Sequence, residues 1–408
     1  MLIFLKLAVR NLFRNKRRTF IAGSAIGLGL AALIFSDALI IGMERNMIAS
    51  ATESFLGEGQ IHHQGFRESQ AVEKTVNNEA DLIGRLERHP AVDHYAPRIM
   101  AFAMITSPAN MASVSMVGIE PELERHLSQI DEAIIEGEYF AEDEMRNIVI
   151  GRKLAELLEV NLGSRVVLTT SQAHSGDLAQ EMFRVSGIFK FNIRQMDRGM
   201  VFVQLPRAQR MLALEDQVHE IALSFTDKNF ARIEKNEFWK DFSTDGNEAV
   251  SWTVLLPEVV MAFEYSDFFT YIIGLILFGV VALGIVNTLF MSLHERMFEF
   301  GVLRAVGTRP WAMGRLVLFE AAALAGLSII LGIILGFLVT LIVAGTGIDY
   351  TGIEFSGVTF RELLYPVMEL QQFIEYPLAV FIFTMLVSLY PAVFAVKISP
   401  AKAMRRSF

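Results

Sequence analysis

A short segment near residue 300 combines charged and apolar residues in a pattern that suggests a working surface. Glu295 and Glu299 lie one helical turn apart, and Arg296 and Arg304 lie two turns apart, with apolar residues between them. Gly307 and the proline three residues later predict that this helix stops and the chain then restarts as another. A helix that is exposed to water yet apolar between its charges needs something to pack against. Membrane headgroups would satisfy it, and a partner protein with a groove would do so better.

The rest of the sequence contains little that would predict an enzyme or a metal site. There is no cysteine, so thiol nucleophiles, disulfides and cysteine-ligated metals are excluded. His62 and His63 would face opposite sides of a strand, so we expect no metal site there. Neither a Gly-x-Ser-x-Gly elbow nor a G-x-x-x-x-G-K-S/T phosphate loop occurs. We therefore expect a non-catalytic chain that binds no cofactor, with any ATP and Mg²⁺ held by a separate polypeptide.

The elements that must position such a helix are membrane spans. Of the 408 residues, 52% are hydrophobic and 20% are charged, against about 25% charged in an ordinary soluble domain. Four stretches are long and apolar enough to cross a bilayer, which predicts an α-helical membrane protein with four transmembrane helices. They are Phe20–Ile41, Phe268–Leu293, Ala321–Ile348 within a third segment of 317–348, and Tyr376–Val396.

Basic residues predict the orientation of these spans. Segments 1–19, 294–316 and 397–408 together carry 14 Lys and Arg, whereas the short loop 349–375 carries one. The positive-inside rule therefore places both termini in the cytoplasm and this loop outside. The insertion Glu44–Ser266 falls on the same outer side and holds 21 basic and 35 acidic residues. Its 223 residues are enough for a folded domain.

This insertion is predicted to be a large extracytoplasmic mixed α/β domain with several small sheets. The polar stretch Ser171–Glu181 predicts a long hairpin connection, which is either a docking element or a solvated loop. Helical spacing at 43–55, and Pro257 at a helix start, predict that the first two spans continue as stalks. Strands are predicted at Tyr95–Thr106, Ala112–Gly118, Arg165–Thr170, Met182–Phe189, Gly199–Val203 and Glu220–Phe225, and helices at Arg152–Leu158, Pro206–Leu214 and Asn229–Trp239.

Two spacings near the first span predict how it is anchored and packed. Lys6, Arg10 and Arg14 lie four residues apart, which predicts an amphipathic helix over 1–19 on the inner leaflet rather than a simple positive anchor. The motifs Gly23-xxx-Gly27 and Gly332-xxx-Gly336 suit close helix packing, with dimerisation as one use of them.

Residues near the outer ends of the first two spans are candidates for contact with a lipid-like substrate. Asp37 is an acid inside the first span, and it is either functional or simply hydrated at the outer boundary. Flexible thioethers and aromatic rings could accept acyl chains, or they could pack the stalks. The candidates of this kind are Met43, Met47, Met261, Phe263 and Phe268.

Motifs along nearly the whole chain resemble one family. The pattern N-x-L-x-M…E-R-x-x-E-x-G-x-L-R-A-x-G, from Asn287 to Gly307, is similar to the signature of permeases in one superfamily of ABC transporters. That superfamily comprises the lipoprotein-releasing (LolC/LolE), macrolide-exporter (MacB) and FtsX-like proteins. The opening Ala8–Arg18, the external Val185–Leu212 and the closing Pro391–Arg405 resemble motifs of the same family.

The resemblance implies an architecture and a set of partners. It implies a coupling helix seated in a groove of a cytoplasmic ABC ATPase, and a second permease that is either another copy or a paralogue. The residues that the resemblance implies for coupling to this ATPase are Glu295, Arg296, Glu299, Gly301, Leu303, Arg304 and Gly307. The expected parts are an interfacial helix at 1–19, spans at 20–41, 268–293, 317–348 and 376–396, a MacB-like periplasmic domain with stalks at 42–267, a coupling loop at 294–316, a periplasmic loop at 349–375 and a cytoplasmic tail at 397–408, with an FtsX-like permease domain over 268–400.

The expected function is that of a permease subunit of an ATP-driven transporter in the bacterial inner membrane. A length near 400 residues without a fused ATPase resembles the branch that extracts lipoproteins for a periplasmic carrier by mechanotransmission. Two alternatives stay open at this point. One is export of an amphiphilic drug or peptide by the same architecture, and the other is FtsX-like signalling to a periplasmic cell-wall hydrolase.

Overall fold

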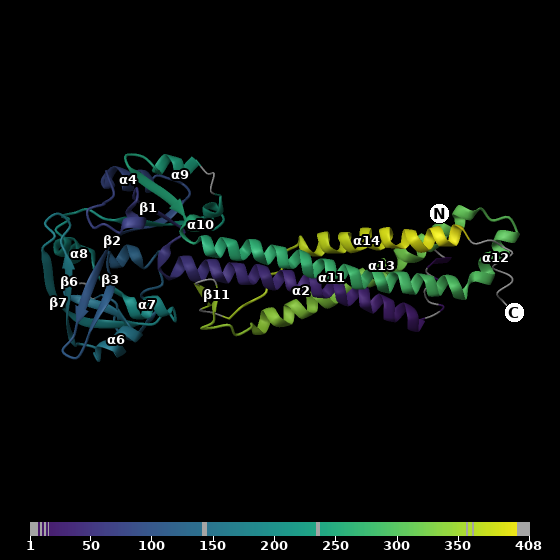
Figure 1. Ribbon diagram of the computed structural model, residues 1–408, viewed down its shortest axis with the longest axis horizontal. Helices are drawn as coiled ribbons and strands as arrows, with labels where there is room; N and C mark the ends of the chain where they lie inside the picture. The colour runs from purple at the N-terminus through teal and green to yellow at the C-terminus, as the bar shows by residue number, and fades with distance from the viewer. Residues whose placement is uncertain are drawn as a thin grey trace. The chain divides into compact units, whose positions relative to one another are not determined.

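The computed structural model describes residues 7–8, 10–11, 14, 16–140, 145–233, 237–355, 358–360 and 363–397. The chain divides into two compact units, here named by their content (Figure 1). The predicted helix over 1–19 lies only partly within the described residues, and the tail beyond residue 397 lies outside them. The helical unit comprises Met1–Glu44, Phe263–Asp349 and Leu363–Phe408, and the sheet unit comprises Arg45–Ala262 and Tyr350–Glu362.

Four long helices build the helical unit, and each is long and apolar enough to cross a membrane. Buried side chains from all four meet in one core, among them Ile34, Ile285, Leu324 and Val380. Helical structure continues from α2 into the π-helix η1 (Thr52–Leu56), and α11 begins at the expected proline, so both predicted helical continuations are confirmed. The helices are α2 (Lys16–Ala51), α11 (Pro257–Glu295), α13 (Pro310–Thr346) and α14 (Gln372–Val396).

Glycines allow α2 and α13 to pack closely. A Cβ atom on Gly332 would lie 2.8 Å from the backbone oxygen of Gly27, and one on Gly336 would lie 3.3 Å from Cα of Ala31. The two predicted small-residue motifs therefore pack against each other within one chain. A larger side chain at these positions would force the two helices apart.

A ten-stranded sheet forms the core of the sheet unit. Its strand order is β10-β1-β9-β2-β3-β8-β5-β7-β4, and β6 pairs with both β2 and β7. Because β6 joins these two strands, β2, β3, β8, β5, β7 and β6 form a closed ring. The strands are β1 (Gly59–His63), β2 (Val92–Thr106), β3 (Met111–Ile119), β4 (Ile134–Gly137), β5 (Asn147–Gly151), β6 (Arg165–Ser171), β7 (Leu178–Phe189), β8 (Met200–Gln204), β9 (Glu220–Phe225) and β10 (Asn247–Ser251), and a separate hairpin holds β11 (Glu354–Phe355) and β12 (Val358–Thr359).

The expectation of several small sheets is wrong because β2 is long enough to join two pairings. Its first half pairs with β9 and its second half pairs with β6, so one sheet extends through both regions. All six predicted strands are present, with ends that differ by a few residues. The predicted connection Ser171–Glu181 is shorter than expected, since Ser171 still pairs with Leu178 and only 172–177 form the turn.

Two of the three predicted helices of this unit are present, and the third is wrong. The segment Asn229–Trp239 forms a 3-10 turn, η2 (Phe230–Arg232), and then α9 (Glu237–Phe242). In one α-helix, Phe230 and Trp239 would point to opposite faces, whereas here both rings pack on Phe225, at 4.8 and 5.7 Å between centroids. The other helices are α3 (Phe66–Ser69), α4 (Glu79–Leu86), α5 (Pro121–Glu124), α6 (Arg152–Leu158), α7 (Arg194–Gly199), α8 (Leu205–Leu212) and α10 (Trp252–Leu255).

A buried ion-pair cluster, named the Arg98 triad, ties β2 to β9 and α5. Arg98 is fully buried, with its Nη2 2.6 Å from Oε1 of Glu124 and its Nη1 3.0 Å from Oε1 of Glu220. The Phe55 ring lies 4.0 Å from the guanidinium carbon. A charge without water is tolerated only with such partners, so each member of the triad requires the other two.

Candidate functional site

A short helix between α11 and α13 is the strongest candidate for a functional surface. Arg296 precedes α12 (Met297–Ala305), and Gly307 leaves the helical region with a φ of +100°. Pro310 then opens α13, where its fixed φ suits the first helical turn. The stop and restart expected from the sequence are therefore confirmed, and α12 lies between two long apolar helices.

Five polar side chains, named the α12 network, surround the start of α12: Asn11, Arg14, Arg296, Glu299 and Glu320. Arg296 Nε lies 3.0 Å from Glu299 Oε2, and its Nη1 contacts Glu320. The other oxygen of Glu299 lies 2.7 Å from Arg14 Nη1. Asn11 donates to Glu320 at 2.6 Å. Each carboxylate thus has two partners, and the network joins the N-terminal segment, α12 and α13.

The α12 network is buried at one end and open to solvent at the other. Arg296 and Glu320 are 12% and 6% exposed, whereas Arg14 and Glu299 are 65% and 40% exposed. The hydrogen bond from Arg14, with help from Arg296, lowers the pKa of Glu299 below its usual value. An exposed pair contributes only about 0–1 kcal/mol. The outer pair can therefore open at small cost while the inner pair holds.

Apolar side chains stand exposed on α12 and the turn that follows it. Phe298, Val302 and Val306 are spaced four residues apart, as on one helical face, and they are 51%, 40% and 83% exposed. Trp311, at the start of α13, is 70% exposed. These four residues are named the apolar crest. The other side of α12 is packed, since Phe300 is 1% exposed within an apolar cluster. A row of exposed apolar side chains is typical of an interaction surface.

The remaining predicted coupling residues lie around this helix. Glu295 is exposed at the end of α11, and Leu303 is 40% exposed beside the crest. Gly301 is buried. Arg304 is half-buried, and its Nη1 lies 3.4 Å from the carbonyl oxygen of Thr308.

Sequence reasoning missed two members of the α12 network. Asn11 lies outside the predicted basic stripe, and Glu320 directly precedes the predicted span that starts at Ala321. An acid at the edge of a membrane span is costly unless it has a partner, so Glu320 was the signal for a basic residue nearby. Arg296 and Arg14 could then have been proposed as the basic residues in its neighbourhood.

The predicted lipid-contact residues fall into two groups. Met261 and Phe268 lie seven residues apart on α11, so they share one helical face. They are 48% and 59% exposed, and Tyr265 between them is also exposed. Met47 and Phe263 are instead buried. Met43 is half-buried. Of the predicted lipid-contact residues, those on the exposed face of α11 are therefore the ones that a bound molecule could reach.

Asp37 has a partner inside the helical unit. Its carboxylate accepts a hydrogen bond of 2.8 Å from the hydroxyl of Tyr376 on α14. The side chain is half-buried. This bond joins α2 to α14, so packing between helices already accounts for an acid at this position.

An apolar patch lies on the outside of the ring of strands, and it is named the outer patch. Its members lie on β2 and β3 and, across the intervening strand β6, on β7 next to the turn 172–177. Exposed methionine and aromatic side chains in one place are typical of adaptable docking surfaces. The members are Phe102, Met104, Met111, Leu178 and Met182, all between 48% and 76% exposed.

Two family descriptions match the chain. Residues 19–234 match the MacB-like periplasmic core domain, and residues 271–400 match the FtsX-like permease C-terminal family. The first match alone spans more than half of the chain. The order of the two matches agrees with a sheet unit inserted after the first long helix.

Curated relatives support the same assignment at low identity. The chain is 24% identical to the lipoprotein-releasing system transmembrane protein LolE of Haemophilus influenzae, over 93% of both chains. It is 22% identical to LolC of Neisseria meningitidis, over 80% of this chain and 79% of that one. It is 23% identical to the macrolide export ATP-binding/permease protein MacB of a Shewanella species, over 84% of this chain and 53% of that one. The chain therefore belongs to the superfamily of multi-pass inner-membrane ABC transporter permeases that join a MacB-like periplasmic core domain to an FtsX-like permease domain.

Proposed function

We propose that this chain is the non-catalytic permease of an ATP-driven transporter, and that α12 receives force from a separate cytoplasmic ATPase subunit. The apolar crest is the observation that carries the proposal. Phe298, Val302 and Val306 stand exposed on α12 and the turn after it, and the α12 network anchors the start of this helix. A groove on a partner would cover these side chains and remove apolar area from water.

The α12 network supplies a route for that force. Movement of α12 acts on α13 through Arg296 and Glu320, and on the N-terminal segment through Arg14 and Glu299. The buried pair resists separation, whereas the exposed pair separates easily. A force on the crest would therefore move α12 and α13 together. The exposed pair between Arg14 and Glu299 would open and could form again afterwards.

Membrane lipoproteins are the proposed cargo. They would leave the membrane along α11 and then pass to a carrier. The exposed face with Met261, Tyr265 and Phe268 offers thioether and aromatic surface to acyl chains. Relatives named for lipoprotein release match over most of their own length, whereas the macrolide exporter matches over 53% of its length. That difference favours lipoprotein release over drug export.

The proposed orientation and partners follow from charge and exposure. The segments rich in Lys and Arg lie at the cytoplasmic ends of the helices, which leaves the sheet unit in the periplasm. A second permease, as another copy or a paralogue, completes the transport pathway. The outer patch, together with the polar turn 172–177 beside it, is the proposed docking place for a periplasmic carrier, because the patch is exposed and apolar.

Cysteine cross-linking in native membranes tests the coupling surface. The chain has no cysteine, so Val306→Cys and Phe298→Cys each introduce the single thiol. A thiol-to-amine cross-linker should join both variants to a polypeptide that carries ABC ATPase motifs. Phe20→Cys is the matched control, since Phe20 is 73% exposed but lies on α2 rather than on the crest. Equal capture by the control, or no ATPase adduct from either crest position, would overturn the assignment.

A further inference from the structure

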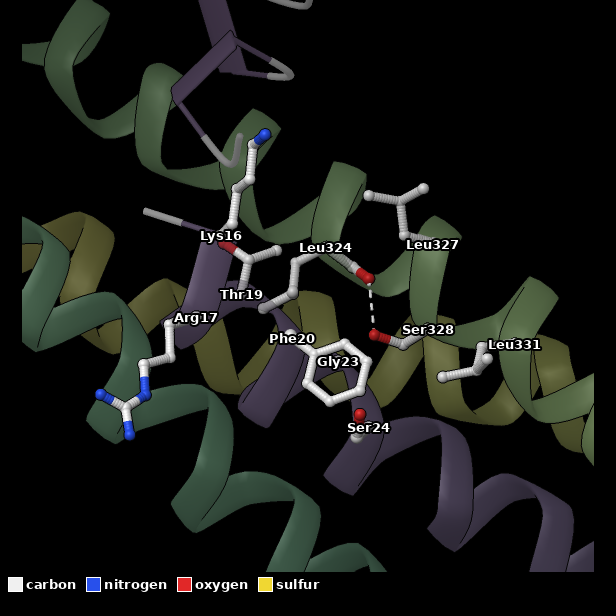
Figure 2. Close-up of a pocket in the computed structure, with 10 residues that line it drawn as sticks. All are labelled: Lys16, Arg17, Thr19, Phe20, Gly23, Ser24, Leu324, Leu327, Ser328 and Leu331. Atoms are coloured by element: carbon white, nitrogen blue, oxygen red, sulfur yellow. Dashed lines mark hydrogen bonds between the residues drawn. The ribbon is translucent and has the colours of Figure 1, made fainter. Parts of the chain in front are cut away.

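A cavity of about 680 Å³ opens between the first turns of α2 and the first half of α13. Figure 2 shows Phe20 of α2 beside the leucines of α13, with Ser24 and Leu331 toward one end, and Lys16 and Arg17 toward the other, where their side chains leave α2 in different directions. The cavity lies within the helical unit and away from the α11 face and the apolar crest. Its lining residues are Lys16, Arg17, Thr19, Phe20, Gly23, Ser24, Leu324, Leu327, Ser328 and Leu331.

The interior of this cavity suits an acyl chain. Phe20 and Leu327 are 73% and 43% exposed, so apolar surface borders its opening. The hydroxyl of Ser328 is already used, since it donates to the carbonyl oxygen of Leu324 at 2.8 Å. From Lys16 to Ser24 the helix rises roughly 12 Å, which is within one leaflet of a bilayer core about 30 Å thick.

The mouth of the cavity is cationic. Lys16 and Arg17 are exposed there, and among the residues that the structure describes neither has a carboxylate partner. Arg14, by contrast, is paired with Glu299. No acidic residue precedes Asp37 in the sequence, so nothing on this part of the chain neutralises the two cations.

We propose that this cavity binds an anionic phospholipid, with its phosphate at Lys16 and Arg17 and one acyl chain along Phe20 and the α13 leucines. A zwitterionic lipid would fill the apolar part but would leave the two positive charges without a net counter-charge. On the proposed orientation the lipid belongs to the cytoplasmic leaflet, which separates it from cargo taken up on the opposite side.

Photo-cross-linking of the purified full-length chain tests this site. Phosphatidylglycerol with a diazirine in its acyl chain should label peptides of α2 and α13 around Phe20 and Leu327. An excess of unlabelled phosphatidylglycerol should remove the adducts, and the same amount of phosphatidylcholine should not. The change Lys16→Gln with Arg17→Gln should lower labelling roughly 30-fold, since each cation near the membrane surface contributes about fivefold.

Two further variants keep the test decisive. Arg309→Gln with Arg315→Gln removes the same charge outside the cavity and should retain the labelling. Ser24→Phe should fill the apolar part and abolish labelling with both cations intact. Equal competition by the two lipids, or equal loss in both double variants, would overturn the site, and disulfide-linked dimers of Phe20→Cys would show that a second copy covers it. None of these measurements involves an ATPase or a cargo, so failure here is distinct from failure of the proposed function.

Discussion

The Arg98 triad and the α12 network are built from the same kinds of charged side chain but use them in opposite ways. The Arg98 triad is entirely buried and joins elements of one folded sheet unit. The α12 network runs from the buried Glu320 to the exposed Arg14, and it joins the N-terminal segment to the neighbouring helices α12 and α13. Burial makes each member of the first cluster depend on the other two, whereas partial exposure lets the second exchange partners. The difference suggests that the sheet unit is rigid and that the region around α12 is where movement is received.

The largest expected effect comes from breaking the triad. Arg98→Met leaves Glu124 and Glu220 buried without their cation, which should destabilise the sheet unit by about 3–5 kcal/mol. Hydrogen exchange of peptides from β2 and β9 in the full-length chain should rise steeply, while peptides from α13 stay protected.

A fully apolar replacement sharpens that result. Arg98→Met combined with Glu124→Leu and Glu220→Leu removes the charges together, so most of the lost protection should return. If the single substitution exchanges as slowly as the wild type, the triad does not hold the sheet together.

The next effect is on transport rather than on folding. Glu299→Lys places a cation between Arg14 and Arg296, so it should separate α12 from the N-terminal segment. Gly301→Trp should do the same by forcing a buried face outward. We expect ATP-driven transport to fall roughly 2- to 30-fold, the range for changes along a coupling route, with membrane insertion intact. Undiminished transport, with the ATPase still co-purifying, would contradict the assignment.

Acid should weaken the packing around His219 before it weakens the α12 network. His219 is buried, its Nδ1 accepts from the backbone N–H of Met100 and its Nε2 pairs with the carbonyl of Val72, and burial lowers its pKa. The folded state therefore prefers the neutral ring, and stability is lost as the pH falls below about 6.5, the unfolded value. The pKa of Glu299 is also lowered, so its pairing persists until the pH falls below about 4.5.

The measurement is hydrogen exchange between pH 7.5 and 5.5, corrected for intrinsic rates. His219→Gln keeps every carboxylate of the wild type, so the difference between the two proteins isolates the histidine. The wild type should lose about 1 kcal/mol more protection in β9 on acidification, the contribution of one hydrogen bond. Parallel profiles would exclude His219 as the cause.

The smallest effect should come from the bond between α2 and α14. Tyr376→Phe removes the hydroxyl that donates to Asp37 and should cost about 0.6 kcal/mol, typical of hydrogen bonds between membrane helices. Thermal unfolding in detergent measures it, with Asp37→Asn as the partner variant, since an amide still accepts the bond. A large loss of transport from Tyr376→Phe at unchanged stability would instead show that Asp37 has a functional role in transport.

Local sequence patterns predicted the helices and strands well, but they could not predict which strands pair across long distances in the chain. Apolar length is sufficient for α11 and α13, and alternation is sufficient for β9, because these signals lie within one segment. The ring through β6 depends on pairings between strands far apart in the chain, which one sequence does not encode locally.

The same limit applies to the candidate site. Charge spacing located α12, yet the partners of Glu299 and Arg296 lie at Arg14 and Glu320, and Asn11 carried no signal of its own. The break in Asn229–Trp239 was missed because both aromatic rings pack on one strand residue, which is a tertiary preference. Burial likewise separated Met47 and Phe263 from the exposed residues of α11.

The most direct test of the account is photo-cross-linking of cargo in native membranes. A photoreactive amino acid at Met43, Met261 or Phe268 should capture acylated lipoproteins, identified by mass spectrometry, and ATP added to the active complex should abolish the adducts. Leu386 on α14 is the matched control, because it is 59% exposed, like Phe268, but lies on another helix. Lipoprotein adducts at the α11 positions that disappear with ATP are the predicted result. Capture of a cell-wall hydrolase or a small amphiphile instead, or equal capture at Leu386, would contradict lipoprotein extraction by this chain.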